Sequence, residues 1–295
     1  MSASKVVVIT GASSGFGRLT AEFLARQGHQ VFATMRELAG RNAKAAEALR
    51  ELGRREGLKL QAAELDVTRD ASVESCVRQV LAEAGRIDVL VNNAGFGYGG
   101  LQESFTSEQA QRIFDTNVVG AHRTIRAVLP QMHRQREGLL VQVSSGVGRV
   151  VLPGMGLYCA SKFALEALSE CYRYELAGSG IDVVCVQPGA YPTEIFGKLQ
   201  PGEDAGRERA YGAARELAPR IGGALSASTA DPMDVANLLL DVIETAAGSR
   251  AARYPVGLPG PGVEAINSVC AQVQEQVLAA MGVADLVRFT KDGSV

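Results

Sequence analysis

Short apolar runs rich in valine and isoleucine alternate along this chain with longer segments of helical period. The runs are nearly continuous in apolar character, which is typical of strands that are covered on both faces. Such alternation predicts right-handed βαβ units and an α/β fold built on a doubly wound parallel sheet, with helices on both faces. The predicted strands are Val6–Ile9, Val31–Thr34, Leu58–Leu65, Val89–Val91, Leu139–Val143 and Val183–Val186. The predicted helices between them are Arg18–Gln27, Ala71–Ala84, Ser107–Arg136 and Tyr158–Ala177.

The pattern changes after the sixth run, where proline, glycine and scattered charges replace the alternation. We expect an insertion at about residues 192–230, with only a weak helix signal at Glu208–Leu217. Asp231 before Pro232 predicts an N-cap with proline at the first helical position, and the helix should span Met233–Ala247. A short strand at Arg253–Gly257 and a C-terminal helix at about 263–281 complete the pattern. We find no repeat and no dividing linker, and therefore predict a single domain over residues 1–295.

Composition and charge exclude several classes of function. The 30 basic and 32 acidic residues give a formal charge of −2, which provides no field to attract nucleic acid and no polybasic tail for a membrane surface. The five cysteines are scattered and the three histidines isolated, so we expect neither disulfides nor a metal site. No apolar run approaches the length of a membrane span or of a signal-peptide core. We expect a cytoplasmic protein without membrane insertion.

A glycine-rich turn follows the first run and precedes a helix. It reads Thr10-Gly11-Ala12-Ser13-Ser14-Gly15-Phe16-Gly17. Glycines here allow a tight turn and let a phosphate approach backbone N–H groups at the N-terminus of the helix. The spacing is G-x-x-x-G-x-G rather than G-x-G-x-x-G, and a turn without a ligand is the alternative. The strand before it and the helix after it favour a nucleotide site.

The end of the second run bears on the choice of nucleotide. NAD-selective sites place a carboxylate there to hold the ribose 2′-hydroxyl. This chain has Arg36 instead, and no acid before Glu37. Because a guanidinium can bind a 2′-phosphate through its fork of donors, NADP is favoured, with NAD as the second choice. The alternative is that Arg36 is only an exposed charge.

Tyr158 and Lys162 are four residues apart and share one face of a predicted helix. A phenol titrates near pH 10, and an ammonium beside it favours the phenolate. Such a pair can protonate a developing alkoxide or take the proton from an alcohol. The spacing alone is weak, since most such pairs are exposed helix faces. Asp66-Val67 and Asn92–Gly95 follow the third and fourth runs, at strand ends where ligands of this architecture bind.

These motifs together resemble the short-chain dehydrogenase/reductase family, closely over about residues 5–195 and loosely over Asp231–Gly257. The pattern is similar to steroid- and retinol-type dehydrogenases and to bacterial carbonyl reductases. The matching motifs are Thr10–Gly17, Asp66-Val67, Asn92–Gly95, Asn117, Ser144-Ser145, Tyr158–Lys162 and Pro188-Gly189 with Thr193. The resemblance implies a Rossmann-like domain in which the insertion at about residues 192–230 is a flexible substrate lid. It also implies an NAD(P)-dependent oxidoreductase that transfers a hydride between the cofactor and a carbonyl or secondary alcohol.

The resemblance further implies a role for each matching residue. Tyr158 would be the general acid/base, and Lys162 would bind the nicotinamide ribose and lower the pKa of Tyr158. Ser145, thirteen residues before the tyrosine, would hold the substrate oxygen, and Asn117 would link Lys162 to solvent through water. The residues expected to contact the cofactor are Gly11, Ser13, Ser14, Gly15, Phe16, Arg36, Asp66, Val67, Asn93, Ala94, Gly95, Tyr158, Lys162, Pro188, Gly189 and Thr193.

The side chains near this site predict a neutral, hydrophobic small-molecule substrate, because they are apolar and partly aromatic. Any of them can instead belong to the core. They are Phe96, Tyr98, Val147, Val150, Leu152, Met155, Tyr191 and Phe196. Tyr191 departs from the family pattern, which more often has a smaller aliphatic residue there. The insertion contains four arginines that we expect to form a solvated face, although one of them could reach an anionic group. They are Arg207, Arg209, Arg215 and Arg220.

Family resemblance also suggests a homodimer or homotetramer built through the helices at Ser107–Arg136 and Tyr158–Ala177. Two other functions remain as alternatives. A lyase or epimerase of the extended family would favour G-x-x-G-x-x-G and a longer C-terminal region. A non-catalytic, NADP-sensing protein usually lacks the tyrosine or lysine that this chain keeps.

Overall fold

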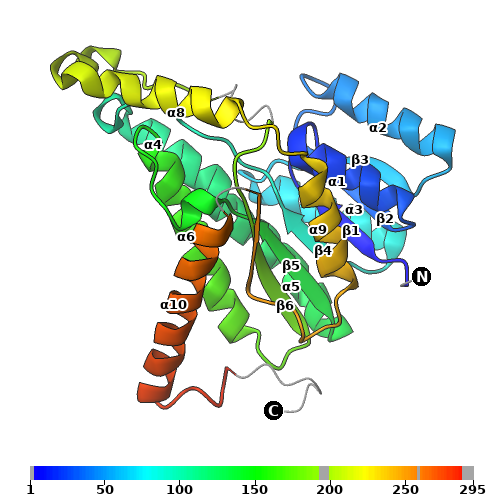
Figure 1. Cartoon of the computed structure of the whole chain (residues 1–295). Coiled ribbons are helices and arrows are strands. Elements are labelled where there is room, and N and C mark those ends of the chain that lie inside the picture. Colours follow the sequence, from blue (N-terminus) through cyan, green and yellow to red (C-terminus); the bar gives the residue numbers. More distant parts are fainter. Residues whose placement is uncertain (1–2, 193–198, 258–259, 288–295) are drawn as a thin grey trace.

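A seven-stranded parallel sheet forms the centre of the computed structural model, which describes residues 3–192, 199–257 and 260–287 (Figure 1). The strand order is β3-β2-β1-β4-β5-β6-β7. The order therefore reverses between β1 and β4, and in such sheets ligands bind at the carboxyl side of the reversal. The strands are β1 (Val6–Ile9), β2 (Gln30–Met35), β3 (Leu60–Glu64), β4 (Val89–Asn92), β5 (Gly138–Val143), β6 (Ile181–Pro188) and β7 (Arg253–Val256).

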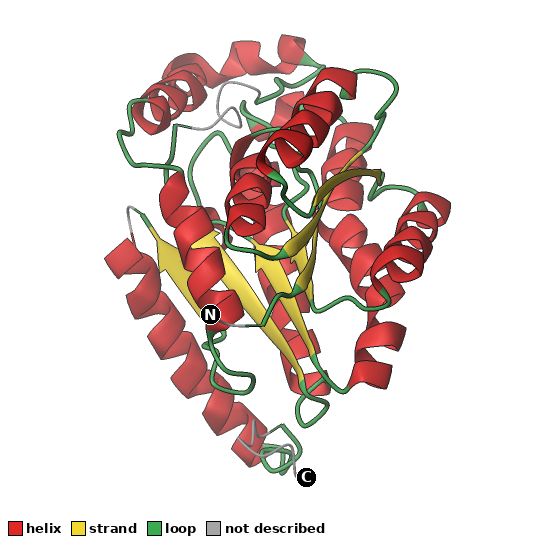
Figure 2. Ribbon diagram, turned by 90° about the vertical axis from the view of Figure 1, so that its right-hand side faces the viewer, coloured by secondary structure: helices red, strands yellow, loops and turns green. Residues whose placement is uncertain are grey.

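Helices cover both faces of the sheet, which confirms the predicted doubly wound fold (Figure 2). Alternate residues of each strand enter two separate cores. Val7 and Ile9 of β1 belong to one core, and Val6 and Val8 to the other. The first core is closed by α1 (Gly15–Arg26), α2 (Ala43–Glu56) and α9 (Met233–Glu244). The second is closed by α3 (Asp70–Ala84), α5 (Gly120–Gln135) and α6 (Gly156–Glu175).

Helix α2 was not among the predicted helices. Its segment is rich in alanine, glutamate, arginine and leucine, which are good helix formers. The buried positions are Ala46, Leu49, Leu52 and Gly53, a narrow stripe on an otherwise charged surface helix. Gly57 ends it in the left-handed conformation, at a φ of 64°.

The predicted helix Ser107–Arg136 is divided into three parts. The first is α4 (Ser107–Phe114), which begins with a capping box between Thr106 and Gln109. A π-helical segment, η2 (Asp115–Val119), follows and leads into α5. π-helical turns inside helices occur frequently at functional sites, and this one contains Asn117.

The described part of the predicted insertion lies over the carboxyl end of the sheet. It contains the 3₁₀ segment η4 (Ala205–Glu216) and helix α8 (Leu217–Ser226), neither of which buries a residue completely. Glu103, in the short 3₁₀ turn η1 (Gln102–Ser104), accepts hydrogen bonds from Arg207 at 3.0 Å and from Tyr211 at 2.8 Å. These contacts join the insertion to the body of the protein. Because Arg207 also pairs with Asp204, its charge is balanced by two acids.

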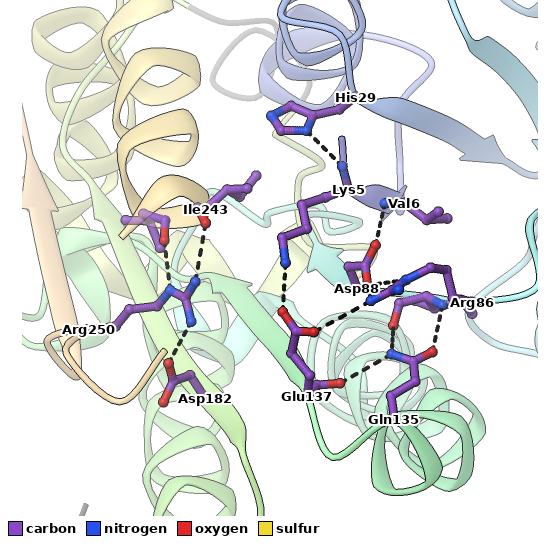
Figure 3. Close-up of polar contacts among 12 residues, drawn as sticks. Lys5, Val6, His29, Arg86, Asp88, Gln135, Glu137, Asp182, Ile243 and Arg250 are labelled. Carbon is purple, nitrogen blue, oxygen red and sulfur yellow. Dashed lines mark hydrogen bonds and ion pairs between the residues drawn. The ribbon is translucent and has the colours of Figure 1, made fainter. Parts of the chain in front are cut away.

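A polar network joins the amino-terminal edges of the strands, away from the predicted site (Figure 3). Lys5 pairs with Glu137 at 2.6 Å, and Asp88 accepts a 2.7 Å hydrogen bond from the backbone N–H of Val6. A second pair, Arg250 and Asp182, is buried at 2.6 Å. The contacts of Lys5, Asp88 and Glu137 hold the ends of β1, β4 and β5 together. Arg250 separately joins the start of β6 to α9, because it also donates to the carbonyls of Val242 and Ile243.

The C-terminal helix α10 (Gly260–Ala280) runs away from the sheet and exposes Val269, Val273 and Val277. No helix in the described part of the chain is both long and apolar enough to span a membrane. The same residues contain no group of three His, Cys, Asp or Glu side chains that could hold a metal ion.

Candidate active site

The predicted site residues that the structure describes gather at the carboxyl edge of the sheet. The turns after β1, β4, β5 and β6 meet there, and α6 and η2 bring Tyr158, Lys162 and Asn117 to the same edge. Arg36, Asp66 and Val67 follow β2 and β3 on the far side of the order reversal. Thr193 and Phe196 lie outside the described residues.

Thr10 and Asn93 tie the glycine turn to the loop after β4. The Thr10 hydroxyl accepts hydrogen bonds from the backbone N–H groups of Asn93 and Ala94, both at 3.0 Å. The Asn93 amide donates to the carbonyls of Thr10 at 2.9 Å and Gly11 at 3.1 Å. The side chain of Asn93 therefore supports the turn. The sequence motif marked both residues without revealing this bond.

The glycines of the turn serve two different needs. Gly11 has a φ of 68°, and a Cβ there would lie 2.7 Å from the Cα of Ala94, so close packing requires glycine. Gly15 also has a positive φ, of 55°, but a Cβ there would meet no atom within 4 Å. The space in front of Gly15 is open.

Helix α1 begins at Gly15 and its first N–H groups are available to an anion. The N-cap residue Ser14 makes no side-chain capping hydrogen bond, and the first turn contains no acid. A helix N-terminus of this kind binds phosphate through its backbone N–H groups and its dipole. With the open space at Gly15, the turn fits the pyrophosphate of a dinucleotide.

Asp66 and Val67 form a fixed corner after β3. The Asp66 carboxylate accepts hydrogen bonds from the N–H of Thr68 at 3.0 Å and from its hydroxyl at 2.7 Å. Burial acts to raise the pKa of Asp66, but these bonds and the nearby Arg36 and Arg69 outweigh it and lower that pKa. The carbonyl of Val67 accepts a 3.1 Å bond from Arg123.

Tyr158 lies in the first turns of α6 with only 6% of its surface exposed. Burial raises the pKa of its hydroxyl above the ordinary value, and a hydrogen bond with Ser145 only partly opposes this. The phenol therefore keeps its proton at neutral pH in this environment.

Lys162 lies one helical turn further along α6 and is also buried. Its ammonium donates a 2.8 Å hydrogen bond to the carbonyl of Val143 and lies 5.7 Å from the centroid of the Tyr158 ring. Burial lowers the pKa of Lys162 to about 8, while the charge of Glu166 acts in the opposite direction. In this structure burial raises the pKa of Tyr158 and Lys162 is not among the groups that shift it, so the lowering of that pKa by Lys162 stays a prediction.

The two serines after β5 have different surroundings. The Ser145 hydroxyl donates to the carbonyl of Pro188 and accepts from the N–H of Val147, both at 3.3 Å. The buried Ser144 hydroxyl has no hydrogen-bond partner among the described residues. The structure also places Ser145, the serine that the family resemblance selects, within hydrogen-bonding reach of the Tyr158 hydroxyl.

Asn117 is buried in η2 and connects the loop after β4 to α6 through hydrogen bonds. Its Oδ1 accepts from the N–H of Phe96 at 3.1 Å, and its Nδ2 donates to the carbonyl of Phe96 at 2.9 Å. The same Nδ2 lies 3.0 Å from the hydroxyl of Ser161, which in turn donates to the carbonyl of Tyr158 at 2.8 Å. The side chain of Asn117 therefore positions α6 and the loop after β4.

The segment after β6 runs beside this group. Gly189 donates a 2.8 Å hydrogen bond to the carbonyl of Val256, which fixes the backbone at Pro188 and Gly189. Tyr191 is fully buried. The expectation that it lines the substrate pocket is therefore not met. Its ring contacts Phe16 edge-on at 5.4 Å, and its hydroxyl reaches Asp234 of α9 at 3.5 Å. Tyr191 is therefore a core residue beneath the glycine turn.

Apolar side chains surround Tyr158 on the side of the insertion. Tyr98, Ile113, Met155 and Cys159 are buried with it in one cluster. Partly buried neighbours complete the wall: Phe96, Phe105, Phe114, Val147, Leu152, Leu157, Leu199, Ile221 and Leu225. Ile221 and Leu225 come from α8, so the insertion contributes to this surface, although the sequence did not single out these two residues.

A turn that fits a phosphate lies at the order reversal of a doubly wound sheet, with a buried tyrosine and lysine and a half-buried serine beside it, and this arrangement indicates a dinucleotide-dependent oxidoreductase. The chain belongs to the short-chain dehydrogenase family, whose model, described as "short chain dehydrogenase", matches residues 5–204. Members of this family transfer a hydride between a nicotinamide cofactor and a carbonyl or alcohol.

Known proteins support this assignment. Retinol dehydrogenase 8 of Bos taurus is 38% identical over 260 residues, which cover 83% of this chain and 79% of the relative. A short-chain dehydrogenase/reductase of Burkholderia phymatum, solved with NAD, has a TM-score of 0.73 at 26% identity, covering 92% of this chain and 95% of that one. A point variant of actinorhodin polyketide ketoreductase, solved with NADPH, has a TM-score of 0.71 at 27% identity, covering 88% of this chain and 98% of that one.

Proposed function

We propose that this protein is an NADP-preferring oxidoreductase that interconverts a carbonyl and a secondary alcohol on a neutral, hydrophobic substrate, with Tyr158 as the general acid/base. The observation that carries the proposal is the placement of the Tyr158 hydroxyl, with Ser145 beside it and an apolar cluster around it. When bound, the nicotinamide supplies or accepts the hydride.

Tyr158 and Ser145 act on the substrate oxygen. Negative charge develops on that oxygen during reduction, and two hydroxyl groups in a largely apolar site stabilise it where it forms. Because its raised pKa keeps Tyr158 protonated at neutral pH, the phenol can donate its proton to the forming alkoxide. The protonated phenol is the form of Tyr158 that the reductive direction requires.

Lys162 supports the face of the Tyr158 ring. Its bond to the Val143 carbonyl fixes the ammonium between β5 and α6, where it faces the Tyr158 ring. A cation at this distance from a ring is attracted to its face. We propose that the remaining donors of this ammonium hold the nicotinamide ribose.

Arg36 supports the preference for NADP. It is exposed at the end of β2, where an NAD-selective protein would have a carboxylate. The acid next to it in the sequence, Glu37, has its carboxylate 3.7 Å from Arg41 and is therefore already paired. Solved relatives carry either NAD or NADPH, so the family alone does not decide the choice.

The apolar wall around Tyr158 supports a hydrophobic substrate. Retinol dehydrogenase 8, a relative at 38% identity, is named for an apolar alcohol. Among the predicted lid arginines, Arg207 pairs with Asp204 and Glu103 and is thereby neutralised.

We further propose a cytoplasmic homodimer or homotetramer. Val119 of η2 and Phe163 of α6 expose 40% and 39% of their surfaces on the helices expected to form the interface. Light scattering on the full chain tests the oligomer. A monomer at micromolar concentration would contradict it.

The function is tested by following NADPH and NADH oxidation against a panel of ketones and aldehydes. The panel pairs each apolar compound with a carboxylate-bearing analogue of similar size. We expect turnover with NADPH and the apolar compounds. Equal efficiency with NADH would overturn the cofactor preference, and a requirement for the carboxylate would overturn the substrate class.

A further inference from the structure

A hollow of about 480 Å³ opens beside the ends of β2 and β3, against α3. Its walls include three acids, Glu37, Glu64 and Asp66, and two arginines, Arg36 and Arg69. It lies on the same edge of the sheet as the glycine turn, two strands away from the order reversal.

Each of the three acids already has a partner. Glu64 accepts hydrogen bonds from the backbone N–H groups of Glu37 at 2.7 Å and Leu38 at 2.8 Å. Asp66 is bonded to Thr68, and Glu37 lies within 3.7 Å of Arg41. The negative charges of the hollow are thus engaged by the protein itself.

The two arginines differ in this respect. Neither the Arg36 nor the Arg69 guanidinium makes a hydrogen bond or ion pair within the described ranges, although both are close enough to Asp66 to lower its pKa. Most other arginines of the described surface, such as Arg78 with Glu74 at 3.8 Å, have an acid nearby. Two guanidinium forks therefore face one hollow without an anion of their own.

The backbone that carries Arg36 is held in place. Glu64 anchors the next two residues, and the Asn42 amide donates a 2.6 Å hydrogen bond to the carbonyl of Arg36. Glu37 adopts a left-handed φ of 56°, which costs free energy in a residue other than glycine, and the Glu64 bonds help to hold it. The position of Arg36 is consequently set before any ligand arrives.

We propose that Arg69 is the second specificity-determining residue for the cofactor, and that it binds the 2′-phosphate of NADP together with Arg36. The inference rests on the proposed NADP preference and extends it to a residue that no motif marked. A phosphate dianion matches two guanidinium forks, each of which can donate two parallel hydrogen bonds. Arg69 enters from the β3–α3 side and Arg36 from the end of β2, so the phosphate is held from two sides.

The test measures binding of adenosine 2′,5′-bisphosphate and of 5′-AMP to the full chain by titration calorimetry. The two probes differ only in the 2′-phosphate. We expect Arg69→Gln and Arg36→Gln each to weaken the bisphosphate about 10- to 100-fold and to change 5′-AMP less than about 2-fold. Arg69→Lys should be intermediate, because an ammonium keeps the charge without the fork.

Arg78→Gln is the matched control, since Arg78 is exposed on α3, the helix that Arg69 precedes, and does not line the hollow. It should bind both probes like the wild type. An Arg69→Gln variant that binds the bisphosphate as tightly as this control overturns the inference. An equal loss of both probes also overturns it.

Failure of the inference can be told apart from failure of the proposed function. If the wild type binds the bisphosphate no better than 5′-AMP, the NADP preference itself is wrong. If the wild type prefers the bisphosphate and only Arg36→Gln removes that preference, the function stands and the role of Arg69 is refuted.

Discussion

The Lys162 ammonium donates its hydrogen bond to the carbonyl of Val143 and lies 5.7 Å from the centroid of the Tyr158 ring. The lysine thus supports the face of the ring and leaves the hydroxyl to Ser145. In this geometry the two residues have separate tasks. In the proposed mechanism, Tyr158 exchanges a proton with substrate, and Lys162 positions the groups around it.

Tyr158→Phe should lower kcat by about 10²- to 10⁴-fold, because it removes the proton donor while keeping the ring that fills the cluster. Steady-state kinetics checks the loss, and a dinucleotide titration should show binding within about 2-fold of the wild type. The control is Tyr174→Phe on the same helix, whose hydroxyl donates to Glu170 at 3.0 Å and makes no other hydrogen bond with the residues that the structure describes. Retained turnover in Tyr158→Phe would refute the mechanism.

Ser145 and Ser144 offer a matched pair of single-atom deletions. Ser145→Ala should lower kcat by about 10²-fold or more, as is typical when one donor to a developing oxyanion is lost. Ser144→Ala should leave kcat near the wild-type value and keep or raise stability, because its buried hydroxyl has no partner to lose. Kinetics and urea unfolding of both variants check this. The reverse order of effects would mean that Ser144 is the functional serine.

Gly11→Ala and Gly15→Ala should separate packing from binding. At Gly11 the new Cβ would clash with Ala94 at 2.7 Å, so we expect a loss of several kcal/mol in the free energy of unfolding. At Gly15 the methyl meets no protein atom, so only left-handed strain of about 1 to 2 kcal/mol remains. Dinucleotide binding should nevertheless fall in Gly15→Ala, since the methyl occupies the pyrophosphate space. Unchanged binding there would argue against a cofactor at this turn.

Burial of Lys162 makes stability depend on pH. Its pKa is about 8 in the folded protein and about 10.4 in an unfolded chain, so between these values only the unfolded state keeps the proton. Stability contributed by this residue therefore rises with pH through this window, and below pH 8 the full cost of burying the charge is present. Lys162→Met should remove that rise. Urea unfolding at pH 7 and pH 10 should show the wild type gaining about 2 to 3 kcal/mol relative to the variant, and parallel changes would exclude the effect.

The sheet could be predicted because its strands are buried on both faces and leave continuous apolar runs. β5 and β6, which are buried at every position, are the clearest cases. Helix α2 was missed because only a thin stripe around Leu49 is buried, so helix-forming composition was the available signal. The interruption of Ser107–Arg136 at η2 depends on tertiary contacts of Asn117 and has no local sequence signature.

The sequence allowed us to predict only that the site residues follow the carboxyl ends of the strands. Parallel topology brings such ends to one edge, and the motifs therefore met as expected. What each side chain contacts could not be read from spacing. Tyr191 lies in the core instead of the pocket, and Arg69 lines the same hollow as Arg36 because β3 pairs with β2.

The segments η4 and α8 contribute no completely buried side chain, yet Ile221 and Leu225 of α8 reach the cluster around Tyr158. Under the proposed function, stability and selectivity are thus encoded in different parts of the chain. The stretch Ala205–Ser226 can accumulate substitutions, or be exchanged for that of a relative, without weakening the two cores on which folding depends. If substrate binds against this surface as proposed, new substrate ranges can evolve at this end of the molecule at little risk to the residues around Tyr158 and Lys162.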